Sequence, residues 1–363
     1  MDLDLTPEQD MLRQSVRGLC ARHAPLSVVR QLEDDPVGYP AVFWEQLGEL
    51  GLLGMTIPEA FGGSGMSMLD AAVVYQELGR ALAPSPHLVS CVLSAGVIAL
   101  DAPRPVQEEW LPKIAGGEAI LTPAWLEPDG GFGPAGVRAV IAGGTVTGVK
   151  RHVLFAGAAT RLLVLAREGD DIVLALVDPA GPGVTLTHQM TVASDTQYRV
   201  ELNHAPASPV ATGWHVWDEV MHDALILVAA QAVGGARYAL EITTQYAKDR
   251  RQFDKPLGAF QSLAHYLADA VTAVDGAETL VYEAAWARSE GRPVDRVAPM
   301  AKLFAAKAFR DVTAMAQQIF GGVGFTLDYD IQLYFRRAKQ LQLSWWNDRY
   351  LEELIAADVL DAV

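Results

Sequence analysis

The sequence predicts an α+β protein in which a small antiparallel β domain separates two helical blocks. Apolar residues recur at helical spacing before and after the middle of the chain, whereas the middle contains short β-branched or leucine-rich runs bounded by glycine-rich turns. Strands enclosed between helical blocks favour this class over alternating βαβ units. We therefore expect an N-terminal helical domain at 1–120, a middle β domain at 121–212 and a C-terminal helical bundle at 213–363.

The first block carries clear helix signals. Thr6 is a candidate N-cap, followed by proline at the first helical position and an acidic residue in the first turn. Helical spacing recurs at 41–53 and 68–83, and the glycine-rich loop at 58–66 must turn sharply between them. The uncharged stretch 81–100 contains two prolines and a histidine, so it predicts a buried helix rather than a membrane span.

The middle and last blocks differ in composition. Three runs have strand character and lie at 137–142, 161–167 and 171–177. Three alanine- and leucine-rich helical regions follow at 218–248, 261–290 and 295–320.

Charge and cysteine content narrow the function classes. The formal net charge of −16 makes nucleic acid and anionic membrane surfaces poor partners. The only cysteines, Cys20 and Cys91, form no CxxC pair and no metal-ligand pattern. The chain begins with an acidic stretch instead of an apolar signal region. These features predict a cytoplasmic protein without a bound metal, a disulfide scaffold or a membrane partner.

Two C-terminal segments contain candidate binding residues. In 246–269, basic residues cluster at a helix end before a Pro-Leu-Gly turn, where Arg250 could bind phosphate bidentately. The alternative is an exposed basic turn that interacts with the helix dipole. In 316–325, Gly321 and Gly322 follow a helix and would admit a ligand or a second backbone. For a glycine pair taken alone, a C-cap and tight turn is the favoured explanation.

Taken together, several segments resemble the acyl-CoA dehydrogenase family along nearly the whole chain. They are E-L-G-L-L-G-M-T-I-P-E-A-F-G-G-S-G (49–65), Q-E-L-G-R (76–80), L-P-K-I-A-G-G-E (111–118), A-K-L-F-A-A-K-A (301–308), R-x-Q-F (250–253) and Q-I-F-G-G (318–322). The resemblance implies an N-terminal helical domain, a β domain and a C-terminal four-helix bundle, the same order that the patterning predicts.

The resemblance also implies FAD, an acyl-CoA thioester substrate and an electron-transfer flavoprotein or similar acceptor. In this family a glutamate removes the α proton while the β hydride passes to the flavin, and the cofactor spans a subunit interface. The implied contacts to the dinucleotide end of a neighbouring subunit's FAD are Arg250, Gln252, Phe253, Gln318, Gly321 and Gly322.

The family's catalytic glutamate is missing from both of its usual positions. Relatives carry Tyr-Glu-Gly-Thr after a segment like R-R-A-K (336–339), and here those four positions are Ser344, Trp345, Trp346 and Asn347. Other members carry the base on the helix before R-x-Q-F, where this chain has Ala224 followed by Leu225 in place of the usual arginine. Neither tryptophan nor alanine can accept a proton.

Two nearby carboxylates are fallback candidates for a relocated base. Asp348 lies three positions after Trp345, and Asp223 directly precedes Ala224. One residue corresponds to about 100° around a helix, so Asp223 is expected to point away from the usual site. Asp348 is also expected to serve as a helix cap or a surface ion-pair partner.

The residues that resemble the flavin-facing part of the β domain are altered too. Leu126 and Phe132 replace the threonine and serine of the family's Thr-Glu-Pro-x-Ala-Gly-Ser-Asp pattern, and Leu154 replaces a threonine near the flavin. His152 could stack on a ring or act as an acid, or could be a hydrogen-bonded histidine at a strand end.

The family's functional residues are therefore lost unequally. The residues that would serve this chain's own flavin and substrate are altered, whereas the residues that would contact the FAD of a neighbouring subunit are intact. This resembles the non-catalytic subunit of actinobacterial α2β2 acyl-CoA dehydrogenases, whose paired unlike subunits process steroid side-chain CoA thioesters. We expect a subunit that completes the FAD site of a catalytic partner in a heterotetramer. A self-sufficient homo-oligomer with a relocated carboxylate and a flavin-free scaffold subunit are the alternatives. If the chain is the non-catalytic subunit of a heterotetramer, Trp345 and Trp346 are predicted to fill the unused active-site pocket of this subunit.

Overall fold

The computed structural model describes residues 4–360, which form two compact units. The first unit contains residues 4–26, 68–83 and 225–360, and the second contains 27–67 and 84–224. The predicted α+β class is confirmed: the seven strands of the main sheet lie in the middle of the chain, with helices on both sides in the sequence. The domain limits at 120 and 212 remain a prediction.

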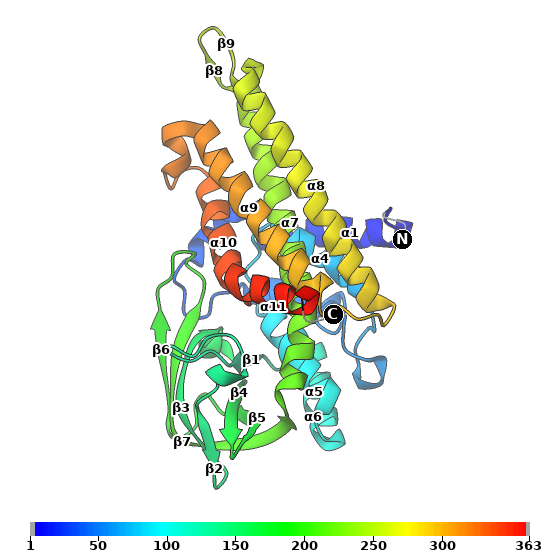
Figure 1. Cartoon of the computed structure of the whole chain (residues 1–363), viewed down its shortest axis with the longest axis vertical. Helices are drawn as coiled ribbons and strands as arrows, with labels where there is room; N and C mark the ends of the chain where they lie inside the picture. The colour runs from blue at the N-terminus through cyan, green and yellow to red at the C-terminus, as the bar shows by residue number, and fades with distance from the viewer. Residues whose placement is uncertain (1–3, 361–363) are drawn as a thin grey trace. The chain divides into compact units, whose positions relative to one another are not determined.

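The first unit is helical (Figure 1). Its helices are α1 (Pro7–His23), α4 (Met68–Arg80), most of α7 (Trp214–Asp249), α8 (Gln261–Ser289), α9 (Val297–Phe320), α10 (Ile331–Leu343) and α11 (Asp348–Leu360), with a short hairpin of β8 (Arg251–Gln252) and β9 (Lys255–Pro256) between α7 and α8. The predicted start of α1 is confirmed: the Thr6 hydroxyl accepts from the backbone N–H of Gln9, and the Gln9 side chain accepts from the backbone N–H of Thr6.

Helices α4 and α7 cross in direct backbone contact. A Cβ added to Gly79 would lie 2.0 Å from the carbonyl oxygen of Gln231, and one added to Gly234 would lie 1.8 Å from that of Gln76. Only glycine allows this approach, because any side chain would overlap main-chain atoms of the facing helix.

Ion pairs surround this crossing and explain the Q-E-L-G-R segment. Glu77 is 4% exposed and accepts two hydrogen bonds from the Arg17 guanidinium, at 2.8 and 2.7 Å. Arg80 donates two hydrogen bonds to Glu241 of α7. Bidentate arginine–carboxylate pairs combine strength with fixed geometry. The segment therefore has a structural role at the junction of α1, α4 and α7.

The second unit contains shorter helices and a β domain. Its elements are α2 (Leu26–Gln31), whose first residue belongs to the first unit, α3 (Ala41–Glu49), a π-helical segment (Leu88–Ser94), α5 (Ala95–Asp101), α6 (Arg104–Ala115), β1 (Leu121–Ala124), β2 (Val140–Ala142), β3 (Thr145–Leu154), β4 (Arg161–Glu168), β5 (Asp171–Val177), β6 (Val184–Gln189), β7 (Gln197–Thr212) and the first residues of α7. The stretch 81–100 is largely buried and helical from residue 88, as predicted.

The β domain is a sheet in which five strands form a closed ring. The strands follow the order β1-β4-β2-β3-β7-β5, β6 pairs with β7, and an additional β4–β5 pairing closes a ring. Its interior is filled by small and branched apolar side chains, among them Val146, Val164 and Val200. The predicted strands at 137–142, 161–167 and 171–177 correspond to β2, β4 and β5.

The predicted antiparallel character of this sheet needs a correction. Most neighbouring strands are antiparallel, but β1 and β2 both pair with β4 in parallel. The chain between β1 and β4 contains β2 and β3, and such a long connection lets β4 run in the same direction as β1. Apolar runs mark strands but carry no information about the direction of their partners.

One helix among residues 4–360 is long and apolar enough to cross a membrane by length and composition. This helix is α7, and 72% of its most apolar window is buried inside the protein. Such burial is typical of the core helix of a globular unit.

We predict that Gly234→Ala destabilises the first unit by about 3 kcal/mol, because its new methyl group would overlap the carbonyl of Gln76. Urea unfolding would measure the loss. Gly276→Ala in α8 is the matched control: its Cβ would meet its nearest neighbour, Phe304, at an ordinary 3.5 Å, so stability should be unchanged or higher. Equal stability of the two variants would contradict the proposed contact.

Candidate functional site

The R-x-Q-F residues lie at the exposed tip of the α7–α8 pair (Figure 1). Arg250 and Gln252 are exposed, and Phe253 is 86% exposed in a left-handed backbone conformation with φ of 52°. The backbone N–H of Leu257 donates to the carbonyl of Arg250 at 2.8 Å and closes the turn. An apolar ring held this far out in solvent is typical of a contact surface.

The Q-I-F-G-G residues lie at the end of α9 beside this tip. Gln318 is exposed, and Gly321 ends the helix with φ of 68° and ψ of −144°, a conformation that favours glycine. Phe320 stacks on Tyr246 of α7 with ring centroids 4.2 Å apart. The structure therefore brings the two predicted binding segments together, although about 70 residues separate them in the chain.

The chemistry of this tip fits the dinucleotide end of FAD. Among the described residues, the Arg250 guanidinium has no hydrogen bond or ion pair, so its donors are available to a phosphate. A Cβ added to Gly321 or Gly322 would meet no atom within 4 Å, so the backbone there is open to a close ligand. The assignment of these residues to FAD remains a prediction.

The segment at the usual glutamate position forms a tight turn between α10 and α11. Trp345 and Trp346 both have positive φ, 55° and 66°, and are 8% and 0% exposed. Asn347 then caps α11, because its side chain accepts from the backbone N–H of Tyr350 at 3.0 Å. Two successive bulky residues in the left-handed region are strained, and surrounding contacts must hold them there.

Lys302 of α9 provides such a contact. Its fully buried ammonium donates to the carbonyls of Trp346 at 2.7 Å and Gln342 at 3.2 Å. Burial lowers the pKa of Lys302 to about 7, and the nearby carboxylate of Asp348 opposes that shift. The sequence analysis missed this residue inside A-K-L-F-A-A-K-A. The detectable signal was a lysine on the apolar face of a helix.

The two fallback carboxylates differ in their surroundings. Asp348 begins α11 and accepts a hydrogen bond from the Gln342 side chain at 2.5 Å. Asn347 is the cap instead, so the expectation of a capping role for Asp348 is wrong by one residue. Asp223 is half-buried, while Ala224 and Leu225 beside it are completely buried in α7. Whether either aspartate acts as a base remains untested.

In the β domain, His152 lies in a bulge of β3. The pairing of β3 with β7 shifts register between Lys150 and Val153, and His152 has φ of 55°. Its Nδ1 lies 2.8 Å from Gln197 Oε1, and the Gln197 amide donates to Asp195 at 2.7 Å. Bulges next to functional sites redirect side chains, but here the ring is hydrogen-bonded, as one of the two sequence-based alternatives expected.

The altered L-E-P-D-G-G-F-G segment lies against the same bulge. The carbonyl of Leu126 accepts from the backbone N–H of Arg151 at 2.9 Å, and the Phe132 ring packs near Trp125 with centroids 6.0 Å apart. Leu126, Phe132 and Leu154 have apolar side chains, which cannot donate hydrogen bonds to a flavin. This part of the chain fits an isoalloxazine ring less well than the tip fits a dinucleotide.

A buried ion pair fixes this segment and was not predicted. Glu127 accepts from the Lys150 ammonium at 2.5 Å, and both side chains are almost completely buried. Lys150 also donates to the carbonyl of Leu165 in β4. Burial lowers the pKa of Lys150 to about 8, and Glu127 opposes this shift. Removing either partner would leave an uncompensated buried charge.

No group of three or more potential metal ligands occurs within residues 4–360. Cys20 and Cys91 are unbonded thiols in the interior, and burial raises the pKa of Cys20 to about 12. Neither thiol is positioned to act as a reactive nucleophile.

We predict that Lys302 makes stability depend on pH. The folded-state pKa of about 7 lies below the ordinary value of 10.5, so between these values the unfolded chain binds a proton that the native protein has released. The contribution of Lys302 to stability therefore rises with pH across this window and is lowest below it. Calorimetry would measure the Tm of the wild type minus the Tm of Lys302→Met at each pH. This difference should increase by roughly 2–5 °C between pH 6.5 and pH 9.5. A pH-independent difference would exclude the proposed protonation change.

Comparison with known proteins identifies the family. The N-terminal domain description of acyl-CoA dehydrogenases matches residues 6–118, and the C-terminal domain description matches 211–359. Acyl-CoA dehydrogenase IpdE2 of Mycolicibacterium smegmatis (strain ATCC 700084 / mc(2)155) is 32% identical over 338 residues, which cover 92% of this chain and 93% of the relative.

Two solved structures of paired proteins have the same fold. The ChsE4-ChsE5 complex from Mycobacterium tuberculosis contains a chain with a TM-score of 0.91 and 29% identity, with 99% of both chains covered. A variant of the Tcur3481-Tcur3483 steroid ACAD gives a TM-score of 0.89 and 29% identity, with 98% of both covered. Members of the matched family are FAD-dependent oxidoreductases that act on acyl-CoA. On these grounds the chain belongs to the acyl-CoA dehydrogenase family.

Proposed function

We propose that this chain is the non-catalytic subunit of a heteromeric acyl-CoA dehydrogenase and completes the FAD site of a catalytic partner. The observation that carries the proposal is a contrast between two sites. The usual glutamate position is occupied by Trp345, which is 8% exposed. In contrast, Arg250, which is predicted to bind the dinucleotide, is exposed and forms no side-chain hydrogen bond or ion pair within residues 4–360.

The first half of the contrast concerns proton abstraction. A base must be ionisable and must reach the α carbon of the acyl group. Trp345 and Ala224 have no ionisable group, and the Trp turn is held by Lys302 through backbone carbonyls. Asp348 accepts from the Gln342 side chain and is the carboxylate near the buried Lys302 ammonium.

The second half concerns the cofactor. When bound, FAD would supply the acceptor for the β hydride of the acyl group. At the tip, the Arg250 guanidinium would neutralise pyrophosphate charge, Gln252 would donate hydrogen bonds and Phe253 would cover an apolar face. At the end of α9, Gln318 would add a hydrogen bond, and the open backbone at Gly321 and Gly322 would admit the dinucleotide closely.

The proposed partner and substrate rest on the similarity of this chain to its relatives. ChsE4-ChsE5 and Tcur3481-Tcur3483 are named as pairs, and the second is named a steroid ACAD. Their similarity to this chain supports an α2β2 assembly that dehydrogenates a steroid side-chain CoA thioester in the cytoplasm and passes electrons to an electron-transfer flavoprotein or similar acceptor. An unlike partner also allows a wider acyl pocket, because this chain needs no active site of its own.

We expect the purified chain alone to contain little flavin and to have no dehydrogenase activity. Co-expression with a sister dehydrogenase that carries the glutamate should give a yellow complex with about one FAD per heterodimer. Absorbance at flavin wavelengths, relative to protein, measures the ratio. Stoichiometric flavin and turnover in the lone chain would refute the proposal.

In that complex, Arg250→Ala should weaken FAD binding by about ten-fold or more, because a charge-assisted phosphate contact is lost. Arg251→Ala is a matched control, since it removes the same charge from the same tip while Arg251 itself donates to the carbonyl of Asp254. Flavin release during dilution would be measured for both. Equal losses would indicate a general charge effect, and no loss in Arg250→Ala would favour a flavin-free scaffold.

A further inference from the structure

Three aromatic side chains join the two predicted dinucleotide-binding segments. Tyr246 lies in α7, one helical turn before Arg250. Phe320 ends α9 and directly precedes Gly321. The rings of Tyr246 and Phe320 stack with centroids 4.2 Å apart and planes 20° from parallel. Tyr329, in the loop before α10, forms T-shaped pairs with both rings, at centroid distances of 6.4 Å and 5.8 Å. Stacked and T-shaped pairs are favourable arrangements of aromatic rings.

The hairpin that contains R-x-Q-F has few contacts of its own. Residues 250–255 are all exposed, and each strand of the β8–β9 pair is two residues long. A two-stranded hairpin is marginally stable at best unless it packs against other elements. One link to the helical unit is the hydrogen bond from the backbone N–H of Arg250 to the carbonyl of Tyr246, at 2.8 Å. The position of Arg250 therefore depends on where Tyr246 is held.

The glycine segment at the end of α9 depends on Phe320 in a similar way. A Cβ added to Gly321 or Gly322 would meet no atom within 4 Å, so neither residue packs closely on that side. Phe320 is only 8% exposed, and its carbonyl accepts a hydrogen bond from the Tyr246 hydroxyl at 3.4 Å. A Cβ added to Gly324 would lie 3.0 Å from the Cβ of Phe320, so the chain beyond the helix folds back closely on this residue. Phe320 therefore anchors the segment.

We propose that Tyr246, Phe320 and Tyr329 are positioning residues, which hold the two segments in place before the dinucleotide binds. The inference rests on the proposed function, because it gives a role to the neighbours of the predicted FAD contacts. Groups that are already ordered lose less conformational freedom when a ligand binds, so the affinity is higher. The role requires no contact between these rings and the cofactor. A cluster that only stabilises the fold would leave the affinity for FAD unchanged.

Phe320→Leu in the co-expressed complex tests this role. The variant keeps an apolar side chain but removes the stack. It should weaken FAD binding by about three-fold or more, because both segments must then be ordered when the cofactor binds. Flavin release on dilution measures the affinity, and calorimetry measures the Tm of the same samples.

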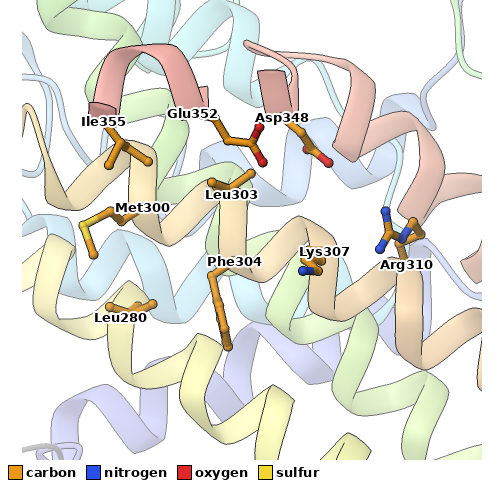
Figure 2. A pocket seen from close by; sticks show the side chains of 9 residues that line it. All are labelled: Leu280, Met300, Leu303, Phe304, Lys307, Arg310, Asp348, Glu352 and Ile355. Carbon is orange, nitrogen blue, oxygen red and sulfur yellow. The ribbon is translucent and has the colours of Figure 1, made fainter. Parts of the chain in front are cut away.

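Phe304→Leu is the matched control on the same helix. Position 304 lies about 24 Å from position 320 along α9, at 1.5 Å per residue. Phe304 lines a groove between α8, α9 and α11 instead of contacting the tip (Figure 2). The control variant should therefore bind FAD with the wild-type affinity.

Two variants of Tyr246 separate the ring from its hydroxyl. Tyr246→Leu removes the ring and should weaken FAD binding as Phe320→Leu does. Tyr246→Phe keeps the stack without the hydroxyl and should stay close to the wild-type affinity. In an Arg250→Ala background, Tyr246→Leu should have a smaller effect, since part of its action passes through Arg250.

Hydrogen exchange of the full-length chain without FAD measures the ordering directly. Tyr329→Leu changes a residue that is 38% exposed, so it should leave the helical unit folded. It should nevertheless speed amide exchange in the peptide 250–257, which includes the N–H of Leu257 that closes the turn.

Wild-type FAD affinity in both Phe320→Leu and Tyr246→Leu would overturn the inference. Equal losses in Phe320→Leu and Phe304→Leu would also do so, as would a Tyr246→Phe variant as weak as Tyr246→Leu or unchanged exchange in Tyr329→Leu. Arg250→Ala separates this failure from that of the proposed function. If Arg250→Ala weakens FAD binding and the ring variants do not, only the positioning role is refuted.

Discussion

The close crossing of α4 and α7 is the constraint on which the helical unit depends. Gly79 and Gly234 let the two backbones touch, and any side chain at either position would overlap main-chain atoms. Because a backbone contact cannot relax as a side chain does, this crossing determines the distance between the helices. The ion pair of Arg80 with Glu241 also joins α4 to α7, and the ion pair of Glu77 with Arg17 joins α4 to α1. The long second half of α7 is thereby fixed, and with it the hairpin that presents Arg250.

The same unit contains a second fixed point, at the turn between α10 and α11. Trp345 and Trp346 adopt backbone conformations that bulky residues rarely tolerate, and Lys302 binds the turn through main-chain carbonyls. A glutamate at this position would need room and solvent access to exchange protons. Buried indoles and a buried ammonium supply neither. The contacts of this turn support the proposal that the subunit leaves the proton transfer to its partner.

Electrostatics connects these features with assembly. The chain is strongly acidic, so a basic side chain without an ion-pair or hydrogen-bond partner indicates a surface that can bind another molecule. Arg250 at the tip is without a side-chain partner among the described residues, whereas Glu127, Lys150 and Lys302 are buried within networks. Charged side chains within buried hydrogen-bond networks stabilise the fold, whereas charged side chains without such partners can bind other molecules. This distinction separates the proposed cofactor-binding tip from the interior.

The sequence by itself determined the order of helices and strands and the cap at Thr6, because these features depend on residues close together in the chain. The resemblance to the family added the prediction that the catalytic glutamate is missing. It also placed Arg250 and Gly321 in recognisable motifs. Only the tertiary structure showed the parallel partners of β4, the bulge at His152 and the role of Lys302. Those features arise from groups far apart in sequence, since Lys302 binds a carbonyl 44 residues away. Periodicity reports which face of an element is apolar, but the partner that covers that face is decided by packing of the whole unit.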